Sequence, residues 1–446
     1  MGEPAPIDLT LLPRSAAIDA SGRLAIAGCD LVELAERFGT PLFVYDEDEI
    51  RARCREYASC FRGAVAYASK AFLCTAMARI VYEEGLDIDV ASGGELHVVL
   101  RAGVPAERIV MHGNNKSTAE LRAALQARVK HVVLDSTDEF VRIGSLVRDE
   151  HLEAPSVLVR VNPGVDAHTH EYLTTGAVDS KFGVPIIGGS ALHVVQRIVE
   201  TNIARFDGLH VHIGSQIFRR DGFAAAIDRV VALVAAIERE VGVTVDEINL
   251  GGGLGVRYTR DDDPVSIAEH AALVHEDFAG TVAAAGLRSM PRLATEPGRS
   301  IVAPAGVTLY RVGTIKRLPA GTVGATPRIY VSVDGGMSDN PRPALYGAEY
   351  EAFLPARAAA ARSEIVTVAG KHCEQGDVLA RSARLPTDTA VDDVLCMPCT
   401  GAYGYSMASN YNKLPRPAVV FVRGGEARVV VRRETDDDLT RLDVEP

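Results

Sequence analysis

The chain has 446 residues, of which 47% are hydrophobic and 24% charged, and its formal net charge is -12. These values exclude a disordered chain, and the length is enough for one large domain and a smaller one. The negative charge is spread along the sequence, which argues against a general nucleic-acid-binding surface and favours work on a small molecule.

The N-terminal stretch MGEPAPIDLTLLPRS lacks the basic region and long apolar core of a secretory signal. No apolar run in the chain approaches the ~20 residues that a membrane span needs. We therefore expect a cytoplasmic protein with no membrane partner and no nucleic-acid partner. The following stretch AAIDASGRLAIAGCD has the pattern of a small hairpin, and we expect the segment 1–40 to join the sheet predicted near the C-terminus.

A repeating unit begins at residue 64. In each unit a short β-rich run ends in polar or glycine residues, and an amphipathic stretch such as STAELRAALQA follows most of the runs. Eight units over about 260 residues match the length of a (β/α)8 barrel, which we assign to residues 41–303. The eight runs cover residues 64–70, 87–92, 108–113, 131–136, 156–162, 208–215, 247–253 and 292–299.

A barrel of this kind carries its active site at the carboxyl ends of the strands. The ends of the predicted runs supply polar residues or glycines: Lys70, Asp89, Ser92, His112, Asn114, Asp135, Asn162, His212, Ser215, Gly251 to Gly253, Glu296 and Arg299. Asparagine and aspartate also favour turns for local reasons, so their presence fits an ordinary barrel as well. A lysine, a histidine and a glutamate at three different ends are harder to explain as turn residues.

The pattern changes after residue 303 to strands without regular helices between them, which indicates an all-β domain over residues 304–446. The fold class is therefore α/β, a barrel plus a C-terminal β-domain. Seven cysteines make no disulfide framework in so long a chain, and the CMPC stretch that contains Cys396 and Cys399 has no second pair and no nearby histidine. We expect these two cysteines to be buried thiols and expect no metal site.

Lys70 lies at a predicted strand end in AYASKAF. Such a lysine either reaches back to water or forms a Schiff base with a carbonyl group. The glycines of NLGGGLG, residues 249–255, either make a tight turn or let backbone N–H groups approach a phosphate. Glu296 could keep the nitrogen of a pyridine cofactor protonated, and His212 could stack on its ring. His210 alternates with His212, and the strand period alone does not say which of the two faces the site.

The chain resembles the diaminopimelate decarboxylases, a family in the alanine racemase-like (fold type III) class of pyridoxal-phosphate (PLP) enzymes. The resemblance runs from about residue 40 to 412 and is carried by YASKAF, DVASGGEL, HGNNKS, HVHIGSQ, GGGLG, EPGRSIV, DNPRPALYGA, CEQGD and GAYGYSMASNYN. HGNNKS and DNPRPALYGA point to the diaminopimelate branch over the ornithine and arginine branches. The sequence departs from the usual pattern of the family at Phe72, Lys371 and Gln375.

The resemblance implies decarboxylation of meso-2,6-diaminopimelate to L-lysine and CO2, the last step of lysine biosynthesis, with PLP as the cofactor. In this family Lys70 would hold PLP as a Schiff base, His212 would stack on the ring, and Glu296 would pair with the ring nitrogen. Residues that would line the phosphate and substrate side are Ser215, Gly253, Gly298, Arg299 and Tyr403. We add Asp89, Gly251 and Gly252 to the cofactor site because they lie at the same strand ends.

Arg299, Arg342 and Tyr346 would hold the far carboxylate of the substrate, and two planar guanidinium groups suit such a group because they bind it bidentately. Tyr403 would also contact the substrate. The resemblance further implies a homodimer with shared active sites, in which the partner subunit supplies Cys373 as the proton donor and Glu374 near the distal amino group of the substrate.

Three other functions fit parts of this pattern. An ornithine or arginine decarboxylase of the same fold should carry an acidic residue in place of Arg342. An amino-acid racemase would need a second catalytic base, usually a tyrosine, which we do not identify. A non-catalytic PLP-binding regulator should have lost Lys70 or Cys373, and both are present.

Overall fold

The computed structural model describes residues 7–62, 64–165, 180–322 and 327–444. The chain divides into two compact units. Unit 1 comprises Met1–Ala52, Val256–Asp263 and Arg299–Pro446, and unit 2 comprises Arg53–Gly255 and Pro264–Gly298. The expected domain limits at residues 40 and 303 remain a prediction.

Unit 2 contains the eight predicted strands in one parallel sheet, in the order β13-β12-β11-β9-β8-β7-β6-β5, with the short β10 (Val184–Pro185) paired to β9. Backbone hydrogen bonds join the two ends of this sheet, because the Ala66 N–H donates to the Thr295 carbonyl and the Ala68 N–H to the Pro297 carbonyl, both at 3.0 Å. The predicted barrel is thereby confirmed. Its strands are β5 (Ala66–Ala68), β6 (Asp87–Val90), β7 (Ile109–Met111), β8 (His131–Leu134), β9 (Ser156–Asn162), β11 (Arg205–His210), β12 (Glu247–Asn249) and β13 (Arg292–Ala294).

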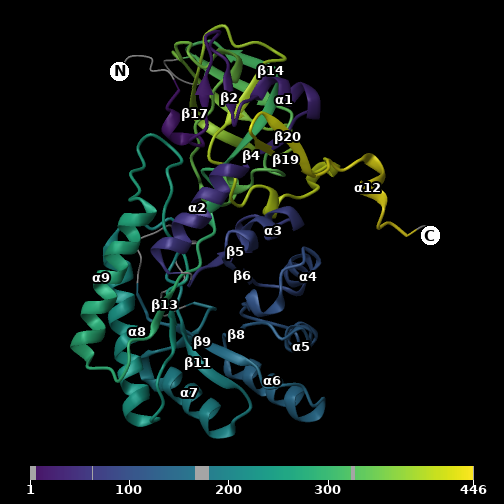
Figure 1. Cartoon of the computed structure of the whole chain (residues 1–446). Coiled ribbons are helices and arrows are strands. Elements are labelled where there is room, and N and C mark those ends of the chain that lie inside the picture. Colours follow the sequence, from purple (N-terminus) through teal and green to yellow (C-terminus); the bar gives the residue numbers. More distant parts are fainter. Residues whose placement is uncertain (1–6, 63, 166–179, 323–326, 445–446) are drawn as a thin grey trace. The chain divides into compact units, whose positions relative to one another are not determined.

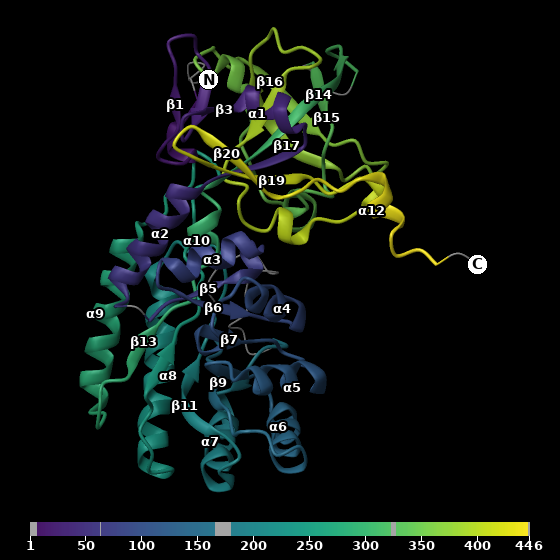
Figure 2. The same cartoon turned by 45° about the vertical axis from the view of Figure 1, so that its right-hand side comes forward.

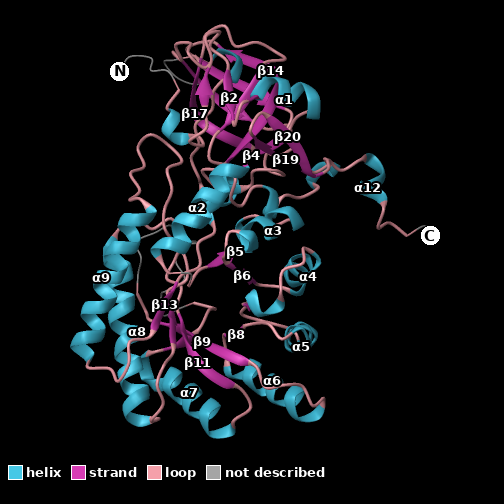
Figure 3. Ribbon diagram, in the orientation of Figure 1, coloured by secondary structure: helices cyan, strands magenta, loops and turns pink. Residues whose placement is uncertain are grey.

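Helices lie outside the barrel strands (Figures 1 and 3). They are α3 (Thr75–Glu83), α4 (Gly93–Arg101), α5 (Thr118–Ala127), α6 (Thr137–Asp149), α7 (Ser190–Thr201), α8 (Arg220–Glu240) and α9 (Ile267–Ala285). Serine caps begin several of them; Ser117 and Glu120 form a complete capping box at α5. Small apolar side chains from four strands, Ala66, Val110, Val133 and Leu158, meet in one buried cluster. Such layers fill the interior of a barrel, so the site must lie at its rim.

Unit 1 is built mainly from strands and loops (Figures 2 and 3). Its large sheet has the order β17-β16-β15-β14-β4-β19-β20, with β18 paired to β14. The strands are β4 (Leu42–Asp46), β14 (Gly306–Leu318), β15 (Arg328–Val333), β16 (Glu364–Ala369), β17 (Val378–Leu385), β18 (Val394–Met397), β19 (Ala418–Arg423) and β20 (Glu426–Val431). Short helices of this unit are α1 (Leu31–Phe38), α10 (Arg299–Val302), α11 (Arg342–Tyr346) and α12 (Asp436–Thr440), while α2 (Glu47–Cys60) runs across the division between the units.

The N-terminal segment belongs to the β-domain, as expected, but its hairpin does not enter the large sheet. The strands β1 (Ala17–Ile18), β2 (Leu24–Ile26) and β3 (Cys29–Asp30) form a separate three-stranded sheet. Their apolar side chains, such as Leu24 and Ile26, share one core with Leu309 of β14 and Val420 of β19. The strand that enters the large sheet is β4. All five of its residues are buried, and it pairs with β14 along one edge and with β19 along the other.

Two further sequence expectations can be compared with the structure. Cys396 and Cys399 of the CMPC stretch are both buried and free, as predicted. Within the residues that the structure describes, we find no helix with both the length and the apolar character required to cross a membrane.

Candidate active site

The carboxyl ends of the barrel strands gather titratable side chains, as the sequence predicts. Lys70 lies on a single turn of 3-10 helix, Ser69–Ala71, directly after β5, and its side chain is exposed. Its positive charge acts on the pKa values of two other predicted residues, Asp89 and His212. Burial, the largest effect, raises the pKa of Asp89 to about 6, while His112 and Lys70 oppose that rise.

Glu296, just after β13, is the most heavily hydrogen-bonded carboxylate at this rim. It accepts hydrogen bonds from His112 Nε2 at 2.8 Å, from His210 Nε2 at 2.9 Å and from Asn249 Nδ2 at 2.9 Å. Burial alone would raise the pKa of Glu296, but the imidazoles of His112 and His210 hold it well below its usual range. Burial lowers the pKa of His210 to about 4, so that this imidazole is a neutral N–H donor near neutral pH. Glu296 is therefore a fixed negative charge inside the rim.

His212 follows β11 and is half-buried. The N–H of Gly252 donates to His212 Nδ1 at 3.3 Å, which leaves the ring proton on Nε2. Burial lowers the pKa of His212 well below its usual value, and the charge of Lys70 lowers it further. The ring is thus neutral and held at one nitrogen, which suits a group that stacks flat on a ligand.

The glycine run after β12 is required by close packing. A side chain at Gly252 would lie 2.3 Å from the carbonyl oxygen of Glu296, and one at Gly251 would lie 2.7 Å from His212 Nδ1. Gly251 also has a φ of 67°, a left-handed conformation that favours glycine. The close approach of these strand ends explains Gly251 and Gly252, and phosphate binding by the run remains a prediction.

Two of the polar residues at the predicted strand ends, and a lysine of the HGNNKS stretch, make structural contacts. Ser92 caps α4 by accepting the N–H of Glu95, and Asn162 accepts the N–H of Gly164 in a turn. Lys116 of HGNNKS is buried, donates to the carbonyls of Gly113 and Val133, and forms an ion pair with the buried Glu139 at 3.0 Å. These contacts agree with the turn explanation for Ser92 and Asn162 and with a core position for Lys116.

Two arginines of unit 1 are packed among tyrosines. Arg299 begins α10 and donates from one terminal nitrogen to the Tyr258 hydroxyl at 2.5 Å, and its guanidinium lies 4.8 Å from the centre of the Tyr403 ring. Arg342 begins α11, lies 4.4 Å above the centre of the Tyr258 ring and donates to the Tyr350 hydroxyl. All but the half-buried Tyr403 are buried. Tyr403 has a φ of 61°, and strained backbone of this kind is commonly retained at functional sites.

The loop 371–377 of unit 1 carries the two residues expected from the partner subunit. Cys373 and Glu374 are exposed in the single chain. The loop is anchored from behind by Asp377, whose carboxylate accepts the backbone N–H of His372 and His372 Nδ1, both at 2.8 Å. The Cys373 N–H donates to Asn412 Oδ1 at 2.9 Å. Ser215 and Tyr346 are half-buried in their respective units.

The charges and donors at the barrel rim fit a PLP cofactor. An exposed primary amine suits its aldehyde, a neutral flat imidazole suits its ring face, and an ionised buried carboxylate suits a protonated ring nitrogen. The ligand atoms of His112, His210 and Glu296 lie within 4.8 Å of one another, a spacing that a metal ion could also use. The hydrogen bonds to Glu296 account for that spacing without one.

Sequence reasoning did not assign His210, Asn249, Tyr258 or Tyr350 to the site. His210 and Asn249 end β11 and β12, so their strand-end position was a usable signal. Tyr258 and Tyr350 are in irregular segments, and their role follows only from contacts between residues far apart in the sequence.

Comparison with known proteins adds independent information. A family model described as "Pyridoxal-dependent decarboxylase, pyridoxal binding domain" matches residues 47–303. A diaminopimelate decarboxylase from Mycobacterium tuberculosis is 48% identical over 439 residues, covering 97% of both chains, and one from Bacillus subtilis is 45% identical over 428 residues, covering 95% of both. The crystal structure of diaminopimelate decarboxylase from M. jannaschii in complex with L-lysine superposes with a TM-score of 0.88 at 33% identity, covering 97% of this chain and 98% of that one.

Proposed function

Because the chain belongs to the diaminopimelate decarboxylases among the pyridoxal-dependent decarboxylases, we propose that it removes CO2 from meso-2,6-diaminopimelate to give L-lysine, with Lys70 as the lysine that binds PLP. This reaction is the last step of lysine biosynthesis. The observation that carries the proposal is the buried Glu296 at the barrel rim, whose carboxylate is hydrogen-bonded by two imidazoles and an amide. A cytoplasmic location remains a prediction.

PLP, when bound, supplies an electron sink for the electron pair that the departing CO2 leaves behind. Lys70 would hold the cofactor through its amine, and the negative charge of Glu296 would keep the proton on the ring nitrogen. His212 would support the ring face. The phosphate and the substrate side would be bound by Ser215, Gly253, Gly298, Arg299 and Tyr403, with Asp89, Gly251 and Gly252 completing the cofactor site.

The second carboxylate of the substrate would be bound by Arg299, Arg342 and Tyr346. A buried guanidinium needs a compensating anion, and among the described residues the polar partner of Arg342 is the Tyr350 hydroxyl, with no carboxylate among its electrostatic neighbours. That observation favours a diacid substrate over ornithine or arginine. The retained Lys70 and Cys373 favour an enzyme over a non-catalytic PLP-binding regulator.

We further propose a homodimer in which Cys373 of the partner subunit returns a proton to the substrate and Glu374 of the partner subunit binds the distal amino group. The exposure of both side chains in the single chain supports this arrangement, since neither is engaged in its own core. The anchoring of their loop through Asp377 supports it as well, because a loop that serves another subunit must hold its shape.

The direct test is CO2 release by the purified holoenzyme from meso-diaminopimelate, L-lysine, L-ornithine and L-arginine. We expect kcat/KM for the diacid to exceed the others by roughly 1,000-fold, because a site built around buried polar groups rejects substrates that leave them unpaired. Lys70→Ala should abolish both turnover and the borohydride-reducible attachment of PLP. Preference for ornithine or arginine, or attachment at another lysine, would contradict the proposal.

A further inference from the structure

The segment Val256–Asp263 lies between two barrel segments in the sequence but belongs to unit 1, and it contains Tyr258. Tyr258 is 5% exposed and contacts both arginines assigned to the substrate. Its hydroxyl accepts a hydrogen bond from Arg299 at 2.5 Å, and its ring lies beneath the Arg342 guanidinium at 4.4 Å. One side chain therefore fixes one arginine through its oxygen and the other through its ring face.

A second tyrosine completes the support. Tyr350 packs edge-on against Tyr258, with ring centres 5.2 Å apart, and its hydroxyl accepts a hydrogen bond from Arg342. Arg342 is 4% exposed, and within the described residues its polar contact is a neutral hydroxyl rather than a carboxylate. The two tyrosines hold the guanidinium groups in place without neutralising the charge of Arg342.

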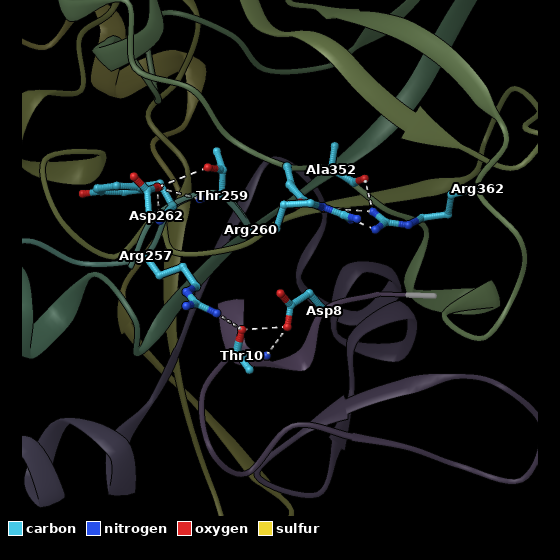
Figure 4. Close-up of polar contacts among 10 residues, drawn as sticks. Asp8, Thr10, Arg257, Thr259, Arg260, Asp262, Ala352 and Arg362 are labelled. Carbon is cyan, nitrogen blue, oxygen red and sulfur yellow. Dashed lines mark hydrogen bonds and ion pairs between the residues drawn. The ribbon is translucent and has the colours of Figure 1, made fainter. Parts of the chain in front are cut away.

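The segment that carries Tyr258 is firmly held within unit 1 (Figure 4). Asp262 accepts the N–H groups of Tyr258 and Thr259 at 3.0 and 2.9 Å, and Arg257 donates to the Thr10 hydroxyl at 3.0 Å. Arg260 binds both carboxylate oxygens of Glu351, the residue next to Tyr350, at 3.0 and 3.3 Å. The backbones that position the two tyrosines are thereby tied to each other.

We propose that Tyr258 is a positioning residue that holds Arg299 and Arg342 at the separation required by the distal carboxylate of the substrate, and so determines the preference for ligands that carry this carboxylate. The inference rests on the proposed function, because it takes from it the assignment of both arginines. It goes beyond the proposed function because it assigns the preference for the distal carboxylate to Tyr258, which acts through the two arginines.

The test compares two ligands that differ by one group. L-lysine retains the distal carboxylate, and cadaverine (1,5-diaminopentane) is the same molecule without it. Calorimetric titration of the holoenzyme gives a Kd for each, and the ratio of the two Kd values measures how much the carboxylate contributes. A partly unfolded variant lowers the stoichiometry of the titration but not the Kd, so a loss of folded protein cannot imitate the effect.

Tyr258→Phe removes the hydroxyl bond to Arg299 and leaves the ring under Arg342. We expect the Kd for L-lysine to rise roughly 10-fold or more, as for a lost hydrogen bond to a charged group, with the Kd for cadaverine unchanged. KM for meso-diaminopimelate should rise by a similar factor, and kcat should change by less than about 3-fold. Tyr258→Leu, which also removes the aromatic ring, should raise the Kd for L-lysine further than Tyr258→Phe does.

Two further variants separate the possible failures. Tyr330→Phe, a matched change on β15, should leave both Kd values unaltered. If the proposed function is right, Arg342→Ala should raise the Kd for L-lysine and leave the Kd for cadaverine unchanged. If Arg342→Ala behaves so and Tyr258→Phe leaves the lysine-to-cadaverine ratio unchanged, the inference about Tyr258 is overturned and the proposed function stands. If Arg342→Ala leaves the ratio unchanged, the assignment of the arginines fails and the inference falls with it.

Discussion

Buried histidines in the barrel unit have different roles according to their partners. His210 lies beside Glu296 and donates to it, whereas His270 on α9 packs between Phe61 and Phe223, with ring centres 6.5 and 4.8 Å away. Burial, acting alone, lowers the pKa of His270 to about 4. Both histidines lie among apolar neighbours in the sequence, and they differ in position, because His210 ends a strand whereas His270 lies within a helix.

His270 should make the protein less stable in acid. Its pKa is about 4 in the folded state and about 6.5 when unfolded, so its contribution to stability is complete above pH 6.5 and is lost as the pH falls towards 4. Replacing it removes that dependence. Between pH 8 and pH 5 the free energy of unfolding should therefore fall by about 2 kcal/mol less in His270→Phe than in the natural protein, as thermal unfolding at several pH values would measure. Parallel pH profiles for the two proteins would contradict the assignment.

At the scale of elements, the loop 371–377 depends on one buried carboxylate. Asp377 accepts three hydrogen bonds, from the N–H groups of Met337 and His372 and from His372 Nδ1. The chain packs so closely around it that a side chain at Gly370 would lie 2.1 Å from Asp377 Oδ2. The loop that presents Cys373 is thus shaped from inside unit 1.

Asp377→Ala should lower the free energy of unfolding by about 3 kcal/mol or more, because each buried donor left without a partner costs about 1 to 3 kcal/mol. Differential scanning calorimetry of the holoenzyme measures the change. Gln375→Ala, an exposed position in the same loop, is the matched control and should shift Tm by about 1 °C or less. Equal Tm values for the two variants would show that the carboxylate does not stabilise the loop.

Local sequence signals were sufficient for the barrel and for the strand-rich character of the C-terminal region, but not for the order of the strands in the large sheet. Each barrel strand, from Ala66–Ala68 to Arg292–Ala294, lies in a short β-rich run that ends in a polar or glycine stretch, and consecutive strands pair in most of the ring. In the large sheet Leu42–Asp46 pairs with strands hundreds of residues away, and no local pattern specifies such a partner.

The same distinction applies to the site. Lys70, His212 and Glu296 could be predicted to lie at the barrel rim because each follows a strand end. Tyr258 could not, because its function depends on arginines from two other segments. Phe72, a departure from the family pattern, is fully buried, and its carbonyl accepts the Tyr67 hydroxyl at 2.8 Å, so it is a core residue rather than a substrate contact.

At the scale of the whole molecule, the proposed shared site requires two chains. Inactive Lys70→Ala subunits and inactive Cys373→Ala subunits, once mixed and exchanged, should regain activity, since a mixed dimer combines the intact Lys70 of one chain with the intact Cys373 of the other. Random exchange should restore roughly a quarter of the natural activity, because half of the dimers are mixed and each has one intact site of two.

The test is the turnover of the mixture, with mass spectrometry to verify that the subunits have exchanged. Regained turnover supports an active site shared between subunits. Activity that stays at the level of the single variants after proven exchange would mean that Cys373 serves its own chain or is not needed. Each variant incubated alone through the same exchange procedure is the control.

The place of β4 in the large sheet has a consequence for how the protein is made. β4 pairs with β14 on one side and with β19 on the other. At a synthesis rate of about 5 to 20 residues per second, residue 423 is added roughly 20 to 75 s after residue 46. During that interval at least the edge of β4 that pairs with β19 is unpaired, and such an edge is a known template for association with other chains. We therefore expect that production of this protein requires Leu42–Asp46 to be shielded from other chains until Ala418–Arg423 has been made.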